Sequence, residues 1–197
     1  MISICIPIYN FHVVDLIITI INQGEESKKP YEVICIDDGS NKETLKLNAE
    51  INSHNAVKYL ILKKNIGRSK IRNLFLENAN YENLLFIDCD CSIQSENFLE
   101  KYFEQLDNPV VYGGRKHHEN PPKNKNKKLR WLYGIKKEDQ NFNYRVKNPY
   151  HCFRSNNFLI KRAILSQIRF NEKIETYGHE DTLLSLEFKE NKIATVS

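Results

Sequence analysis

The first hundred residues alternate short apolar runs, rich in β-branched residues, with longer amphipathic stretches. Runs that are apolar at every position are typical of strands buried on both faces, and the amphipathic stretches are typical of helices that cover them. This rhythm predicts an α/β fold with a mostly parallel central sheet and helices on both faces. The expected strands are Ile2–Ile6, Val33–Ile36, Val57–Leu62 and Leu84–Ile87.

The stretches between these strands carry helix start and stop signals. The expected helices are His12–Asn22, which Gly24 ends; a helix capped by Ser40 or Asn41 that runs to about Ser53; Gly67–Ala79; and a helix capped by Ser95.

The second half has a weaker pattern. Residues 121–128 are too polar to pack and are expected to form a loop, which Leu129, Trp131 and Leu132 attach to the body again. Phe158–Leu165 resumes an apolar pattern, and Asp181–Glu190 has the spacing of a helix.

Composition limits the class of protein. Hydrophobic residues make up 41% of the 197 residues and aromatic residues 11%, which excludes a disordered chain. No run of 18 apolar residues exists, so the sequence predicts no membrane span. The chain has five cysteines, an odd number, and three of them lie inside apolar runs. Both observations favour reduced thiols and a cytoplasmic protein. Cys89 and Cys91 lack the spacing of a zinc knuckle.

Positive charge is concentrated in the middle of the chain. Residues 115–162 hold 14 Lys or Arg against 3 Asp or Glu, and residues 115–137 hold nine against one, Glu119. A solvated loop explains this stretch, and so does attraction to an anionic membrane or a lipid diphosphate. Nucleic acid is a weaker alternative, because no recognition motif or interleaved aromatics accompany the loop. We therefore expect a peripheral membrane contact and no nucleic-acid partner.

Polar side chains follow three of the four expected strands. Open α/β sheets bind ligands in the crevice outside the carboxyl ends of their strands, so these groups are expected around one crevice. They are Tyr9 and Asn10, Asp37 and Asp38, and Asp88 with Asp90.

Asp88-Cys89-Asp90 is the most informative triplet. In an extended strand residues i and i+2 face the same side, so both carboxylates would point into the crevice and Cys89 away from it. Two close carboxylates favour a hard divalent cation shared with a diphosphate. Two solvated aspartates at a strand end remain an alternative.

Three further motifs each have a structural and a functional explanation. Asp37-Asp38-Gly39-Ser40 suits a turn, or a carboxylate that accepts the imide N–H of a pyrimidine. The segment 65–73 suits a capped helix, or a cationic helix start at which Arg72 reaches the crevice. Residues 178–181 suit an N-cap, or a general base for an acceptor hydroxyl.

Taken together, these segments resemble a family 2 glycosyltransferase with the GT-A fold, of the inverting bacterial polysaccharide type. Five motifs stand in the family's order and spacing: residues 6–10, 33–40, 65–73, 86–90 and 178–181. Residues 155–162 and 170–172 also resemble the family's segment before the catalytic base. The resemblance covers residues 1 to about 190.

The resemblance implies a role for each matching residue. Pro7, Tyr9, Asp37 and Asp38 would line the nucleobase pocket, and Asn65 and Arg72 would contact the nucleotide or brace the acidic pair. Asp88 would lie by the ribose, and Asp90, with Asp88 beside it, would bind Mn²⁺ or Mg²⁺. Asp181 would be the base with Glu180 as its neighbour, and His179 and Arg115 would lie on the acceptor side.

The implied reaction transfers a sugar from a nucleotide-sugar, with UDP as the expected nucleotide, to a glycan or lipid-linked acceptor in surface polysaccharide synthesis. A sugar-1-phosphate nucleotidylyltransferase shares the fold class, but its Gly-rich N-terminal loop is absent here. A nucleotide-sugar-binding module without turnover is a further alternative.

One GT-A domain over residues 1–197 is expected, with a nucleotide-sugar half (1–114) and an acceptor half (115–197). Related enzymes continue beyond this point, so the chain is expected to lack a C-terminal extension with a metal-coordinating His or a membrane-associating tail. The expected location is the cytoplasm, including the inner face of the membrane.

Overall fold

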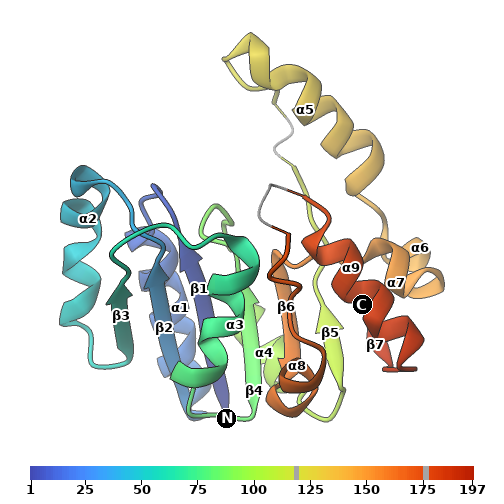
Figure 1. Cartoon of the computed structure of the whole chain (residues 1–197), viewed down its shortest axis with the longest axis horizontal. Helices are drawn as coiled ribbons and strands as arrows, with labels where there is room; N and C mark the ends of the chain where they lie inside the picture. The colour runs from blue at the N-terminus through green and yellow to red at the C-terminus, as the bar shows by residue number, and fades with distance from the viewer. Residues whose placement is uncertain (118–119, 175–177) are drawn as a thin grey trace.

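The computed structural model describes residues 1–117, 120–174 and 178–197. Within these residues the centre of the molecule is a seven-stranded sheet in the order β3-β2-β1-β4-β6-β5-β7 (Figure 1). β6 is antiparallel to both of its neighbours, β4 and β5, and the other strand pairs are parallel. The expected mostly parallel α/β sheet is confirmed. The strands are β1 (Ile2–Ile8), β2 (Tyr31–Asp37), β3 (Val57–Ile61), β4 (Asn83–Ile87), β5 (Val110–Tyr112), β6 (Asn157–Lys161) and β7 (Thr195–Val196).

Helices cover both faces of the sheet because alternate residues of each buried strand point to opposite sides. Ile4, Ile6 and Cys35 pack on one face with α1 (Val14–Ser27) and α4 (Phe98–Phe103). Cys5 and Ile34 pack on the other face with α3 (Arg68–Asn78), α8 (Arg162–Ile168) and α9 (Glu180–Glu190). Phe86 and Phe158, on the neighbouring strands β4 and β6, stack with ring centroids 4.9 Å apart in this second layer.

Two helix ends differ from expectation. α1 does not stop at Gly24 but continues to Ser27, where Lys28 takes the left-handed conformation. Gly24 is instead a packing residue: a Cβ there would lie 2.4 Å from the ring of Tyr31. α4 begins at Phe98, and Ser95 does not cap it; its hydroxyl donates to the Asn97 side chain.

The helix after β2 begins as expected. The side chain of Asn41 accepts a hydrogen bond from Thr44 N and caps α2 (Lys42–Asn48), which continues as the 3₁₀ helix η1 (Ala49–Ser53). The five cysteines are free thiols, as expected. Burial raises the pKa of Cys89 to about 11, so this thiol is protonated at neutral pH.

The basic stretch forms helix where a loop was expected. Residues 125–138, here called the basic arm, comprise the 3₁₀ helix η2 (Lys125–Lys127), α5 (Lys128–Tyr133) and the π-helix η3 (Gly134–Glu138). Leu129 does not attach it to the body, because this side chain is 80% exposed, and Leu132 is also exposed. The arm projects beyond the body at the end where β1 and β2 terminate (Figure 1).

Two short helices, α6 (Phe142–Lys147) and α7 (Pro149–Cys152), return the chain from the arm to β6. None of the helices in the described residues is long and apolar enough to cross a membrane.

Candidate functional site

A cleft of about 430 Å³ lies at the carboxyl ends of β1, β2 and β4. β1 is hydrogen-bonded to both other strands, so the residues that follow the three strands meet at one edge of the sheet. Eight of the predicted site residues line this cleft: Pro7, Tyr9, Asp38, Asn65, Arg72, Asp88, Asp90 and Arg115. Phe11, Arg68 and Ile71, to which the motifs had assigned no role, line it as well, and so does Cys89, which was expected to point away.

Asp38 fixes the loop in front of α3. Its Oδ1 accepts a hydrogen bond from Ile66 N at 2.7 Å, and its Oδ2 accepts one from Gly67 N at 3.1 Å. Burial raises the pKa of Asp38 and outweighs these two hydrogen bonds, which act in the opposite direction. The carboxylate therefore lines the cleft and holds the backbone just before α3.

Asp37 does not line the cleft, in contrast to the expectation. It is the last residue of β2 and fully buried, and its carboxylate accepts hydrogen bonds from Ser40 N and the Tyr59 hydroxyl. Asp38, the first residue after the strand, lines the cleft in its place. Asp37 holds the turn that contains Gly39.

Asp88 and Asp90 both line the cleft, but not by strand alternation. β4 ends at Ile87, and Cys91 N donates to Asp88 O at 3.0 Å, which closes a turn over the triplet. Cys89 consequently also contacts the cleft instead of pointing away from it.

The two carboxylates of the triplet have different surroundings. Asp88 Oδ1 accepts a hydrogen bond from Arg72 Nη2 at 2.5 Å, and Asp88 Oδ2 lies 3.7 Å from Arg68 Nη2. Asp90 is exposed and has no ion pair with any residue that the structure describes. Asp88 is thus neutralised by arginine, and Asp90 is the carboxylate open to a ligand.

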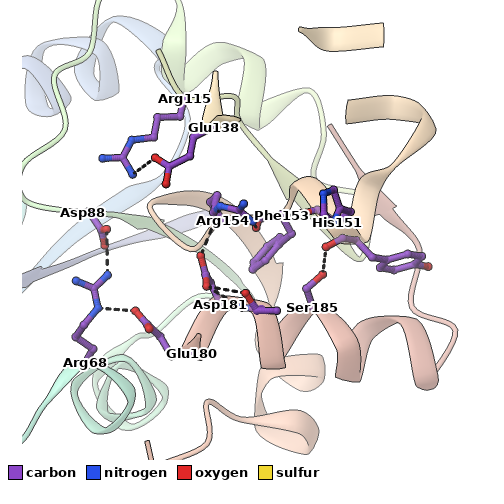
Figure 2. Close-up of polar contacts among 12 residues, drawn as sticks. Arg68, Asp88, Arg115, Glu138, His151, Phe153, Arg154, Glu180, Asp181 and Ser185 are labelled. Carbon is purple, nitrogen blue, oxygen red and sulfur yellow. Dashed lines mark hydrogen bonds and ion pairs between the residues drawn. The ribbon is translucent and has the colours of Figure 1, made fainter. Parts of the chain in front are cut away.

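Arg68 joins the two sides of the cleft. Its Nε lies 2.5 Å from Glu180 Oε1, so the first residue of α3 is tied both to the first residue of α9 and to Asp88 (Figure 2). Burial alone would raise the pKa of Glu180, but the charge of Arg68 outweighs it and lowers that pKa. The only signal in the sequence that could have identified Arg68 is its place directly after Gly67, at the start of a helix.

Glu180 and Asp181 point in different directions at the start of α9 (Figure 2). Glu180 turns toward Arg68, whereas Asp181 turns toward Arg154, whose Nε lies 4.0 Å from Asp181 Oδ2. Asp181 is about one-fifth exposed, and its Oδ1 accepts a hydrogen bond from Thr182 N. Neither acid is among the cleft-lining residues.

His179 precedes α9 in the left-handed conformation, with φ of 69°, and its side chain does not cap the helix. Gly178 before it has φ of 108°, and no atom lies within 4 Å of where a Cβ would be. His179 thus occupies the N-cap position without capping through its side chain, which is exposed, and Glu180 and Asp181 form the acidic first turn.

The basic arm contacts the cleft through Arg115. Arg115 Nη1 lies 3.7 Å from Glu138 Oε2, and Arg130 and His117 also contact the Glu138 carboxylate (Figure 2 shows the Arg115 pair). His117 further contacts Asp139 through both its backbone N–H and its ring Nδ1. Glu119, the acid expected in this stretch, lies outside the described residues.

Comparison with known proteins agrees with this arrangement. Residues 3–169 match the family model described as glycosyl transferase family 2. The chain belongs to this family. It is 30% identical over 118 residues to a chondroitin synthase of Pasteurella multocida, an alignment that covers 57% of this chain and 12% of that protein. The chain spans between 12% and 44% of the length of the curated relatives it matches.

Two solved structures illustrate the shared fold. TarS of S. aureus in complex with UDP-GlcNAc has a TM-score of 0.65 and 23% identity, over 94% of this chain and 52% of that chain. The mannosyltransferase PcManGT from Pyrobaculum calidifontis, in complex with GDP-Man and Mn²⁺, has a TM-score of 0.66 and 17% identity, over 100% of this chain and 54% of that one. At these identities the likeness establishes the GT-A fold of this family 2 glycosyltransferase.

Proposed function

We propose that this family 2 glycosyltransferase moves a sugar from a nucleotide-sugar to a hydroxyl of a glycan or lipid-linked acceptor, with inversion at the anomeric carbon, in surface polysaccharide synthesis. The observation that carries the proposal is the cleft itself, which the exposed Asp90 lines together with the cationic side chains of Arg68, Arg72 and Arg115. Such a mixture of charges suits a diphosphate that binds a cation.

The nucleotide belongs at the end of the cleft formed by Pro7, Tyr9 and Asp38. The half-exposed Tyr9 ring offers an aromatic surface to a base, and the remaining lone pairs of Asp38 can accept an imide N–H. UDP is proposed because uracil carries that N–H. The UDP-GlcNAc complex of TarS supports this choice.

A divalent cation fits the donor set. Mg²⁺ and Mn²⁺ at nucleotide sites are commonly held by one or two carboxylates together with substrate phosphates. Asp90 provides such a carboxylate, whereas Asp88 is engaged by Arg72 and Arg68. No group of three acidic, His or Cys side chains stands ready for a metal in the described ranges, so the diphosphate would complete the coordination. Bound there, Mn²⁺ or Mg²⁺ would supply positive charge to the leaving group.

Asp181 is the proposed general base. It takes the proton of the acceptor hydroxyl while that oxygen attacks C1 and the bond from C1 to the diphosphate oxygen breaks. Arg72 and Arg68 would stabilise the negative charge on the departing UDP. Glu180 positions the base indirectly, because its pairing with Arg68 fixes the start of α9.

His179 and Arg115 are proposed to contact the acceptor. His179 is exposed next to the base, and Arg115 lines the cleft at the root of the basic arm. Such cations suit an anionic or lipid-linked acceptor, which would be met at the inner face of the cell membrane.

A UDP-release assay over a panel of UDP-sugars tests the proposal. We expect UDP release that requires Mn²⁺ or Mg²⁺, is abolished by a chelator and is accelerated by the right acceptor. UDP binding without release from any sugar would instead favour a binding module. Release of pyrophosphate from UTP and a sugar 1-phosphate would favour a nucleotidylyltransferase.

A further inference from the structure

The basic arm is exposed on one side and packed on the other. Gly134 is buried, and a Cβ there would lie 2.3 Å from the His117 ring, while Trp131 and Ile135 are half-buried. The opposite side carries Leu129, Leu132 and Tyr133, which follow one another at helical spacing. All three are exposed, Leu129 to 80% and Tyr133 to 56%.

Lysines flank this apolar strip. The arm contains five lysines, all exposed: Lys125, Lys127, Lys128, Lys136 and Lys137. None of them forms an ion pair with any residue in the described parts of the chain. Glu138 is the single acid of the arm, and its carboxylate is already engaged by arginine and histidine. The outer face of the arm is therefore apolar in the middle and positively charged at the edges.

We infer that the basic arm docks on the surface of an anionic lipid bilayer. A short helix with exposed Leu and aromatic side chains between lysines buries its apolar face at the boundary of headgroups and acyl chains. The lysines would be attracted by anionic headgroups. A solvated face does not account for Leu129 and Tyr133, because exposed apolar side chains gain nothing from water. Nucleic-acid bases could stack on the Tyr133 ring, but they do not account for the exposed aliphatic side chain of Leu129.

The arm also links the membrane to the cleft. Glu138 at its end pairs with Arg115, which lines the cleft, and the arm projects from the end of the sheet where the cleft lies (Figure 1). Docking would hold the open side of the cleft near the lipid surface, where an acceptor on a lipid carrier would be presented. This consequence rests on the proposed function, but the docking itself is measurable without turnover.

Vesicle co-sedimentation is the first test. We expect the full chain to bind phosphatidylcholine vesicles that contain phosphatidylglycerol, to bind phosphatidylcholine alone weakly, and to lose binding as salt rises. Replacing lysines of the arm by Gln should weaken binding by about fivefold for each lysine. Leu129→Ser with Tyr133→Ser should weaken it at unchanged charge. The matched control is Leu47→Ser on α2, which removes a side chain of similar exposure, 52%, away from the arm.

The single tryptophan of the chain, Trp131, allows a direct reading of the contact. In a Trp131→Phe background, Tyr133→Trp places the reporter on the outer face of the arm. Its emission should shift to the blue with anionic vesicles, whereas Leu47→Trp in the same background should not shift. Equal shifts at both positions, or none at position 133, would overturn the inference.

Two other outcomes would also overturn it. Binding to DNA or RNA that the lysine variants lose, without vesicle binding, would assign the arm to nucleic acid. A concentration-dependent dimer that Leu129→Ser dissociates, again without vesicle binding, would assign its apolar face to a second copy of the chain. Vesicle binding without UDP release from any sugar would leave the docking intact and count only against the proposed function.

Discussion

The guanidinium of Arg72 lies 2.5 Å from the carboxylate of Asp88 and is almost completely buried, with 2% of the side chain exposed. It also packs over the ring of Phe170, 5.6 Å from the ring centroid. A buried charge of this kind depends on its partner, because an unpaired ion in the protein interior is costly. The first acid of the triplet therefore has a structural task that the second acid, Asp90, does not share.

Asp88→Asn and Asp90→Asn should separate the structural role of Asp88 from the cation-binding role proposed for Asp90. Asp88→Asn leaves the Arg72 charge uncompensated and should lower the free energy of unfolding by about 3 kcal/mol. Asp90→Asn alters an exposed side chain and should change it by less than about 0.5 kcal/mol. Urea unfolding measures both. If Asp90→Asn lost UDP release without losing stability, the assignment of Asp90 to the cation would gain support; equal stability losses would contradict the division of roles.

The pair of Arg68 and Glu180 predicts a pH dependence of stability. The pKa of Glu180 is lowered in the folded chain from its ordinary value of 4.5, so the native state prefers the ionised form. The stabilisation is complete above the pKa of the unfolded chain and is lost as the pH falls through the lowered folded value. As the pH falls below about 4.5, the Glu180→Gln variant should therefore lose less thermal stability than the unmodified chain loses. An unchanged pH profile would contradict the ion pair.

Gly39 and Gly67 both have positive φ, 73° and 91°, but differ in the space around them. A Cβ on Gly39 would lie 2.7 Å from the backbone carbonyl carbon of Lys64, whereas no atom lies within 4 Å of a Cβ on Gly67. Gly67→Ala should cost about 1–2 kcal/mol of backbone strain. Gly39→Ala should cost about 1–3 kcal/mol more, because the backbone beside Asn65 must move. Chemical denaturation of the two variants in parallel checks the order.

Asp181→Asn should abolish transfer and leave nucleotide binding intact, because the side chain turns toward Arg154 and is not among the residues that line the cleft. A lost general base lowers turnover by roughly 10² to 10⁴. The matched control is Glu190→Gln, an exposed acid at the far end of the same helix. Turnover and UDP affinity measured together are decisive: full turnover in Asp181→Asn would contradict its role as base.

The first hundred residues could be predicted well because their apolar runs leave few alternatives to a buried parallel sheet. The position of Asp38, Asp88 and Asp90 at one edge followed from that sheet, since carboxyl ends of parallel strands meet. The burial of Asp37 did not follow, because it depends on the hydrogen bond from the Tyr59 hydroxyl, a contact between strands that the local sequence does not report. The turn over Asp88–Cys91 is likewise a tertiary feature, since its geometry depends on where β4 ends.

The contact made by Arg68 and the helical form of the basic arm were not predicted, for different physical reasons. The contact of Arg68 with Glu180 joins residues 112 positions apart, and no local pattern reports such a pairing. In the arm, Leu129 and Leu132 were expected to pack on the body because apolar side chains usually do. In the structure both leucines are exposed, whereas Trp131 is half-buried and Gly134, at the start of η3, is buried beside the His117 ring.

The antiparallel strand β6 lies between β4 and β5 in the sheet although it follows both in the chain. A genetic crossover after residue 114 would therefore replace β6, which lies inside the sheet. It would not exchange a unit that folds separately. The segment between β5 and β6 contributes no strand to the described sheet. It can therefore vary in length and sequence among related genes while the sheet is inherited unchanged, and of the described residues that line the cleft only Arg115 would vary with it.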